Sequence, residues 1–361
     1  MTLRVIIYRL GVIPLLLLLC ILAACSQQDL DQEEQGMVSL KVLASPGTKA
    51  GEGGTATATL PAKETAIFDL SIFIFNSNGD VIGFTSQDFS DGKPTAVVVK
   101  TRKATGCSVY AIANAKTLNK NGTSPFDGVS TLSVFKTKYL SFTDAKAPND
   151  DQCLLMMGVS SNFDTSSAGS ATITLKRLAS RIDYTITVNN DYETKFPIVV
   201  DSYQLRNVPT STLYQQSDFT NPSMPSSTTF ADLDKVPTSI SSGAAATSAD
   251  PYYVYANGNT DPDPNSSKGT YLDIHAYSEV QGADGTKYTV WESNFRVNMP
   301  GNRVLPNYHY KIDIVINGSV KGKDGGVITT YKAYPFFSGG NLERWNDKWN
   351  NNNGQVKIDL N

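Results

Sequence analysis

The sequence has few of the residues that build catalytic and metal-binding sites. It contains only two histidines, His275 and His309, and each lies inside an alternating pattern typical of a β-strand. Two histidines without cysteines nearby, or a carboxylate at ligand spacing, do not make a zinc site. Gly-x-Ser-x-Gly, P-loop and Gly-x-Gly-x-x-Gly motifs are also absent. A glycosidase-type carboxylate pair is compatible with the composition, but no pair stands out. We therefore predict no enzyme, no metal site and no cofactor.

Charge is scarce as well. Asp, Glu, Lys and Arg make up 18% of the chain, and the net charge is −3 with a pI near 5.5. A chain without a basic excess is a poor partner for nucleic acid. Ser, Thr, Asn and Gly are plentiful, which is typical of an extracellular β-rich protein rather than a cytosolic helical one.

The longest apolar run stands at the N-terminus. Arg4 and Arg9 accompany "LGVIPLLLLLCILAA", which is too short for a membrane-spanning helix and is typical of a secretory signal. The run ends in Leu-Ala-Ala-Cys25, which resembles the lipobox of bacterial lipoproteins. We predict that residues 1–24 are a signal peptide and that Cys25 becomes an acylated N-terminus held in the outer membrane. An ordinary signal peptide that leaves a free thiol is the alternative.

The other cysteines are few. Cys20 lies in the predicted signal peptide, so only Cys107 and Cys153 remain besides Cys25. An oxidising compartment favours a disulfide between Cys107 and Cys153, and two buried free thiols are the alternative.

The rest of the chain alternates with the period of a β-strand. Asn78-Gly79 and Asp284-Gly285 are typical of tight hairpin turns between such strands. In the first hairpin, the pattern places Leu70, Ile72 and Ile74 on one face and Phe73 and Phe75 on the other. The strands are expected within 67–84, 107–115, 153–159, 171–191, 271–280, 288–297, 308–320 and 327–337. The Ser/Thr/Pro-rich stretch 208–270 is expected to form surface loops around a short strand, "YYVYANG".

The fold class is therefore all-β, and the length suits two domains. We predict two tandem antiparallel β-sandwich domains over residues 50–180 and 181–361. Before them lie an acidic, solvated tether over residues 25–36 and a separate strand over residues 37–49.

The two ends of the mature chain carry near-equivalent strands. The first has Val38, Leu40 and Val42 at alternating positions and is followed by a Gly-rich loop with Lys49. The last, within residues 354–361, alternates in the same way at Val356, Ile358 and Leu360. Because the period and the apolar volume match, either strand suits one and the same groove.

Several segments together resemble the fimbrillins, the lipoprotein pilins of type V pili. The similarity covers both ends and the middle of the chain and is weak over 190–250. It rests on the signal peptide with Cys25 and on the segments "VSLKVLASPGTKAGEG", "LSIFIFNSNGDVIG", "VYAIANA", "LKRLASRIDYTI", "PYYVYANGN" and "PNYHYKIDIVINGSV".

This resemblance implies a surface fimbria built by donor-strand exchange. A lipoprotein precursor reaches the outer membrane, and a trypsin-like protease cuts after the basic residue of the loop, here Lys49, before Ala50. The first strand leaves, and the C-terminal strand of another copy or another fimbrial subunit takes its place. The fibre supports adhesion to a host surface or to other bacteria.

Two departures leave alternatives open. The major fimbrillin has Arg where this chain has Lys49, and the tail after "YPFF" is longer here. An uncleaved anchor subunit or a tip subunit is therefore one alternative. A monomeric surface lipoprotein that binds host glycoprotein or glycan is another, with the aromatic side chains of Tyr214, Tyr252, Tyr253 and Tyr255 as its candidate site.

Overall fold

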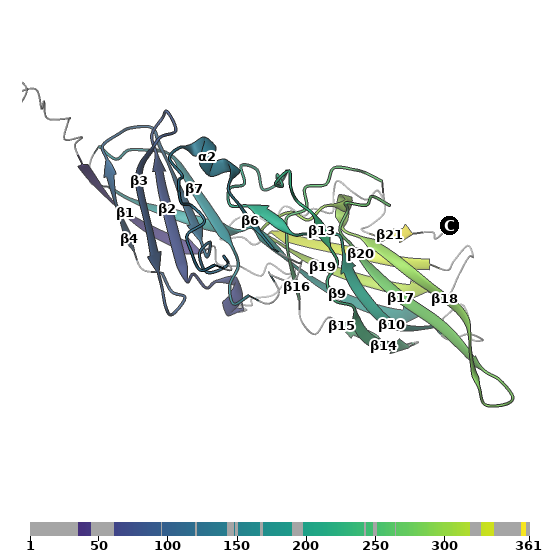
Figure 1. Ribbon diagram of the computed structural model, residues 1–361. Helices are drawn as coiled ribbons and strands as arrows, with labels where there is room; N and C mark the ends of the chain where they lie inside the picture. The colour runs from purple at the N-terminus through teal and green to yellow at the C-terminus, as the bar shows by residue number, and fades with distance from the viewer. Residues whose placement is uncertain are drawn as a thin grey trace, which may run out of the picture.

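The computed structural model is made almost entirely of β-strands. It describes residues 61–317, except for 95, 120, 143–147, 149–150, 167–168, 190–197, 242, 248–250 and 264. It also describes the backbone of residues 35–44, 326–335 and 355–358. Figure 1 shows two β-rich halves in an elongated arrangement, with the earlier strands at one end and the later strands at the other.

The N-terminal half is a closed barrel with the strand order β1-β4-β3-β2-β5-β7-β8. Its strands are β1 (Gln35–Ala44), β2 (Asp69–Phe75), β3 (Val81–Asp88), β4 (Val97–Arg102), β5 (Cys107–Ala113), β7 (Met156–Phe163) and β8 (Gly169–Arg177). Also in this half are a 3₁₀ turn η1 (Ala62–Glu64), the short helix α2 (Leu132–Thr137) and β6 (Tyr139–Ser141).

The C-terminal half packs two sheets face to face. One has the order β14-β10-β17-β18 and the other β15-β9-β19-β20-β21, with β16 also pairing with β9. The elements are β9 (Ala179–Asn189), β10 (Ile198–Arg206), β11 (Val208–Pro209), β12 (Ser211–Leu213), β13 (Phe230–Ala231), β14 (Val236–Ser241), β15 (Ala245–Thr247), β16 (Tyr252–Tyr255), β17 (Tyr271–Gln281), β18 (Lys287–Asn298), η2 (Pro300–Asn302), β19 (Tyr308–Asn317), β20 (Gly326–Pro335) and β21 (Gln355–Ile358). The hairpin of β17 and β18 projects from the far end of this half (Figure 1).

Three groups of buried side chains hold these layers together. One fills the barrel and includes Leu70, Ile72 and Ile74, and a second lies between the two sheets of the C-terminal half. The third contains Phe73 and Phe75 of β2 with residues of both halves. Every residue of β2 is buried because one face points into the barrel and the other into this third group. The predicted division of faces in β2 is thus confirmed.

The third group joins the halves through tyrosines of the Ser/Thr/Pro-rich stretch. Tyr214, Tyr253 and Tyr255 are all buried, and Tyr255 stacks on Phe142 with ring centroids 4.9 Å apart. The prediction that 208–270 forms surface loops is therefore wrong at these positions. Since these three rings are covered by core side chains, they do not form an exposed glycan site.

The N-terminal fold differs from a plain antiparallel sandwich in two ways. Its sheet closes on itself, and β1 runs parallel to β8. In the C-terminal half β9 likewise runs parallel to β19. These pairings join strands far apart in the sequence, so alternation within one strand does not reveal them.

The segments "VYAIANA" and "PNYHYKIDIVINGSV" each contain an asparagine with a left-handed backbone conformation that the fold requires. Asn114 has φ 68°, and its amide donates hydrogen bonds to the Ala66 and Leu154 carbonyls at 2.9 and 2.7 Å. Asn307 has φ 63°, and its side-chain oxygen accepts the backbone N–H of Arg177 at 3.0 Å. Asparagine tolerates this conformation better than other residues with a Cβ, and its short amide satisfies buried backbone groups.

Gly258 packs against the chain so closely that a side chain has no room. A Cβ at this position would lie 2.1 Å from the Pro222 carbonyl oxygen. We expect Gly258→Ala to lower the free energy of unfolding by about 2 kcal/mol, measured by urea titration. Gly106→Ala is the control, because Gly106 has open space around it and a φ of +65°, so only backbone strain changes there. Equal losses in the two variants would contradict the steric explanation.

Candidate functional site

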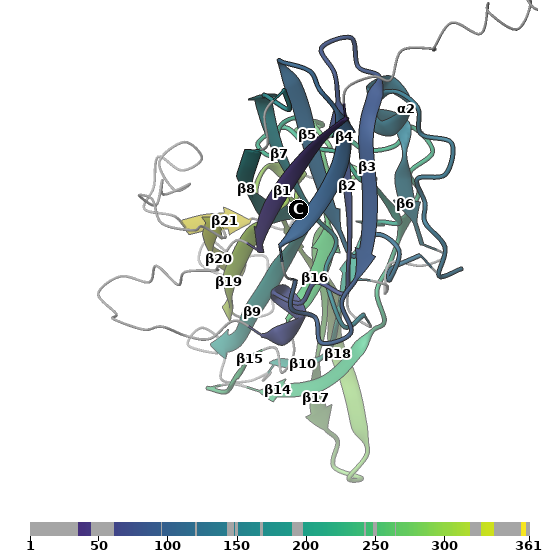
Figure 2. The same ribbon diagram turned by 90° about the vertical axis from the view of Figure 1, so that its left-hand side faces the viewer.

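The most distinctive feature of the barrel is the position of its first strand. β1 lies between β4, to which it is antiparallel, and β8, to which it is parallel, and so closes the barrel (Figure 2). Val38 and Leu40 stand opposite Val99 and Val97 of β4, and Val42 stands opposite Ile173 of β8. Without β1, the barrel would have two unpaired edges along one slot.

The walls of this slot are apolar. Val97 and Val99 of β4 and Ile173 and Leu175 of β8 are at most 1% exposed and belong to the core of the barrel. β4 alternates strictly between buried and exposed residues. The alternating apolar positions of the first strand therefore stand in register with buried positions on both neighbours.

Both ends of the chain segment after β1 are fixed at the junction of the halves. The last pair of β1 is Ala44 with Leu175. The chain is described again from Pro61, and Glu64 in η1 accepts a hydrogen bond at its backbone carbonyl from Arg177 Nε at 2.7 Å. Lys49 and Ala50, the predicted processing position, lie between Ala44 and Pro61 in the sequence and are outside the described residues. Cys25, which precedes β1, is also outside the described residues.

The last described strand lies at the edge of a sheet in the other half. β21 pairs antiparallel with β20, with Val356 opposite Thr329 and Ile358 opposite Val327. It is the end strand of its sheet, so one of its two backbone edges has no partner strand among the described residues. Leu360 lies outside the described residues.

The two remaining cysteines are not bonded to each other. Both are free and buried, Cys107 in the group that fills the barrel and Cys153 in the group that joins the halves. The predicted disulfide is therefore absent, because the two thiols lie in different groups of core side chains. Burial raises the pKa of Cys153 to about 12, so its thiol stays protonated.

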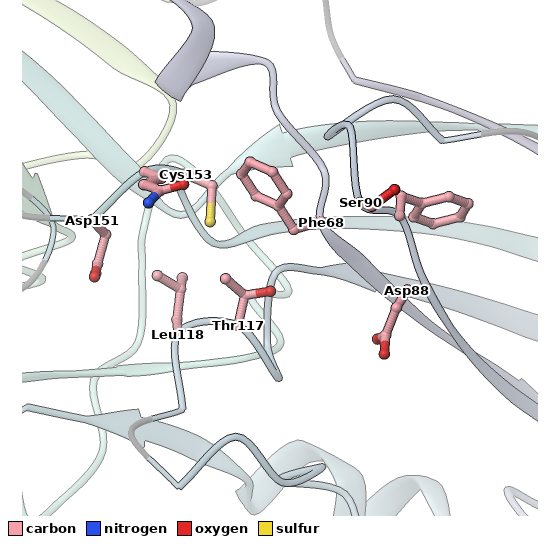
Figure 3. A pocket seen from close by; sticks show the side chains of 9 residues that line it. Phe68, Asp88, Ser90, Thr117, Leu118, Asp151 and Cys153 are labelled. Carbon is pink, nitrogen blue, oxygen red and sulfur yellow. The ribbon is translucent and has the colours of Figure 1, made fainter.

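A cavity of about 680 Å³ opens beside Cys153. Phe68, Phe89 and Leu118 form apolar parts of its wall, and Asp88 and Asp151 also line it. Figure 3 shows the side chains of Phe68, Leu118 and Asp151 around Cys153. Its only thiol is the protonated Cys153, which lacks the nucleophilic thiolate form. Among the described residues no group of three His, Cys, Asp or Glu side chains is placed to hold a metal ion, and no helix is long and apolar enough to cross a membrane.

His275 bridges three strands of the C-terminal half. Its Nδ1 lies 2.6 Å from Asp201 of β10, at a β-bulge, and its Nε2 lies 2.7 Å from Glu292 of β18. Partial burial lowers the pKa of His275, but the hydrogen bonds to the two carboxylates outweigh it, so the net pKa is raised above 6.5. The protonated ring therefore links the strands as a cation.

This bridge predicts a pH-dependent contribution to stability. Since the pKa is higher in the folded state, the contribution is complete below about pH 6.5 and is lost as the pH rises through the folded-state pKa. We expect His275→Gln to lower the free energy of unfolding at pH 5.5 by about 1 kcal/mol, because Glu292 is largely exposed, and by much less at pH 9. Urea titrations at both pH values test this, and a loss that grows with pH would contradict it.

No pattern in the sequence pointed to Glu64, although this residue is fully buried at the junction. Glu64 stands in a short polar segment, "PAKETA", without any periodic pattern. Its partners Arg177 and Arg181 lie in "LKRLASRIDYTI", one of the segments that carry the fimbrillin resemblance. The pairing depends on the turn that brings η1 against β8 and β9, which local patterns do not contain.

Comparison with known proteins shows which family model and which solved structures this chain resembles. Residues 37–195 match the family of the major fimbrial subunit protein (FimA). No match to a curated protein sequence was found. Among solved structures, a candidate cell adhesion protein of Parabacteroides distasonis superposes with a TM-score of 0.59 at 17% identity, over 84% of this chain and 98% of that one.

Two further structures share the fold. A candidate cell adhesion protein of Bacteroides eggerthii gives a TM-score of 0.57 at 17% identity, over 84% of this chain and 96% of that one. A fimbrilin (FimA) of Porphyromonas gingivalis gives 0.55 at 14% identity, over 84% of this chain and 99% of that one. The family match over residues 37–195 and the fold shared with the fimbrilin show that this chain is similar to the FimA family of fimbrial subunit proteins.

Proposed function

We propose that the chain is a pilin subunit that polymerises by exchange of its first strand for the last strand of a neighbour. It is exported as a lipoprotein through Cys25 and is cut after Lys49, which releases β1 from the barrel. The C-terminal strand of another copy, or of another fimbrial subunit, then fills the slot between β4 and β8. The fibre supports adhesion.

The single observation that carries this proposal is the insertion of β1 between β4 and β8. β1 has six register pairs with β4 and seven with β8, whereas β21 has four pairs with β20 and, among the described strands, none on its other side. A strand that moves from the edge position of β21 into the slot would gain backbone partners on both sides. Such strand addition is a known mode of peptide recognition.

The apolar contribution favours the same exchange. Burying Val356, Ile358 and Leu360 in the slot would contribute on the order of 5–9 kcal/mol, as an upper estimate. The slot offers the buried walls of β4 and β8 to receive them. Because the strands are at opposite halves of the molecule (Figure 1), the contact is head-to-tail and produces a filament rather than a closed ring.

Lys49→Ala tests the processing step. We expect the variant to remain on the cell surface as an acylated monomer that begins at Cys25, because β1 stays covalently attached and occupies the slot. The measurement is the ladder of polymers on gels run without boiling, together with electron microscopy of the cell surface. Lys93→Ala is the control, since Lys93 is an exposed lysine in another loop.

Fibres of normal length from Lys49→Ala would show that polymerisation does not depend on this cut. A wild-type chain that keeps its acylated Cys25 and forms no ladder would favour the alternatives, an anchor subunit or a monomeric surface lipoprotein.

A further inference from the structure

A cluster of buried and partly buried charged side chains surrounds Glu64 at the junction of the two halves. The Glu64 side chain is fully buried, and its Oε1 accepts hydrogen bonds from the Tyr253 hydroxyl at 2.6 Å and from Arg181 at 3.1 Å. The Glu64 carbonyl accepts the bond from Arg177. The segment just before β2 is therefore tied to β8, β9 and β16 at once.

The same set of contacts reaches β19. Arg181 Nε donates to Asp183 at 3.0 Å, and Asp183 lies 2.5 Å from His309 Nε2. The side-chain oxygen of Asn307 also accepts a hydrogen bond from the backbone N–H of Arg177. We call the side chains of Glu64, Arg177, Arg181, Asp183 and His309 the junction cluster.

Burial makes this cluster sensitive to the loss of any member. Arg177 is 0% exposed; burial lowers its pKa to about 10, and the charge of Glu64 partly offsets this effect. Arg177 is thus still a cation at neutral pH. Removing the Glu64 carboxylate from this buried position would weaken the charge balance around Arg177 and Arg181 and leave the Tyr253 hydroxyl without that acceptor, so we expect the joined strands to loosen together.

The cluster begins where the pairing of β1 ends. β1 pairs with β8 from Gly169 to Leu175, and Arg177 follows two residues later. On the other side, η1 is the first described element after β1. Loss of β1 would therefore remove ladder hydrogen bonds from β8 up to Leu175 but would leave every contact of the junction cluster in place.

We propose that the junction cluster limits how far the barrel opens after β1 is removed. The slot opens along β4 and along β8 up to Leu175, while η1, the end of β8 and the start of β9 keep their fold. Before a donor strand binds, the slot of the subunit is then open while the contacts between its two halves remain intact. This inference rests on the proposed function, because it concerns the state that the release of β1 creates.

Hydrogen exchange measures this confinement directly. In the full secreted chain, Leu40→Asp with Val42→Asp would drive β1 from the apolar slot without any protease. We expect amides of 97–102 and 169–175 to exchange about tenfold faster or more, and those of 177–183 and 308–312 to stay within about twofold of the unaltered chain.

Adding Glu64→Gln to the same chain removes the central charge of the cluster. The fast exchange should then spread into 177–183 and 308–312, again by about tenfold or more. Adding Asp88→Asn instead is the matched control, because Asp88 forms an exposed ion pair with Lys116 in the same half.

A second measurement covers the case in which the aspartate variant does not fold. A specific protease sequence placed within 45–60 allows the chain to fold first and to be cut afterwards, and the same amides are followed. Fast exchange throughout 177–183 with the cluster intact, or no spread after Glu64→Gln, would overturn the proposal. Retention of β1 after the cut would count against its release, which belongs to the proposed function, while the aspartate variant still tests the cluster.

Discussion

Deleting residues 354–361 is expected to abolish fibre formation and to leave a folded monomer. The deletion removes Val356, Ile358 and Leu360, the side chains proposed to fill the slot of the next subunit. In the isolated subunit, β21 pairs only with β20 among the described strands, over four register pairs at the edge of its sheet. Its loss therefore leaves the core of the C-terminal half intact. Electron microscopy and gel filtration measure the two outcomes.

The alternation of the last strand supplies a matched control for this deletion. Lys357 lies between Val356 and Ile358 in the sequence, so in a strand it points to the opposite face. Lys357→Gln should leave polymerisation unchanged, whereas Val356→Asp with Ile358→Asp should abolish it as the deletion does. Normal fibres from the deleted chain would show that another segment is the donor.

Glu64→Ala is expected to cause the largest loss of stability of any single substitution considered. It removes the buried carboxylate that pairs with Arg181 and accepts the Tyr253 hydroxyl, and it takes away the negative charge beside the buried Arg177. Breaking a buried pair in this way costs roughly 3–5 kcal/mol. Urea titration at pH 7 measures the loss. Glu64→Gln should lose less, because its amide oxygen still accepts the hydrogen bond from Tyr253.

An exposed carboxylate in the same half provides the comparison. Asp88 is 62% exposed and pairs with Lys116, so Asp88→Ala should change stability little. Similar losses for Glu64→Ala and Asp88→Ala would show that the junction cluster contributes no more to the free energy of unfolding than an exposed ion pair does.

Local pattern was enough to predict the hairpins. β2 and β3 pair around Asn78-Gly79, and β17 and β18 pair around Asp284-Gly285, as alternation and turn residues indicated. Gly79 has φ 87° and Gly285 has φ 79°, which is the left-handed backbone that glycine permits. These features depend on residues close in sequence, so a strand pattern contains them.

The alternation of apolar residues could not predict which strands far apart in the sequence pair with each other. Val38, Leu40 and Val42 show that the first strand has an apolar face, but nothing in them specifies β4 and β8 as neighbours. The burial of Tyr214 and Tyr255 was missed for a related reason. A Ser/Thr/Pro-rich composition is only correlated with surface loops, whereas the packing of these rings depends on how the two halves meet.

The candidate site, too, was predictable from the sequence only in part. The matching ends of the chain were evident from the alternation alone, and the register of β1 against buried residues of β4 and β8 is consistent with it. The junction cluster gave no comparable signal, because Glu64 meets Arg177 and Arg181 across more than a hundred residues of sequence.

The N-terminus of the protein recovered from the cell surface tests the central claim most directly. Mass spectrometry of the intact protein and of its first peptide identifies that residue and any attached lipid. A start at Ala50 without lipid is the predicted result, because it means that Lys49 is cut and that β1 has left. A start at acylated Cys25 in every surface copy would contradict the claim, because the first strand would then still occupy the slot.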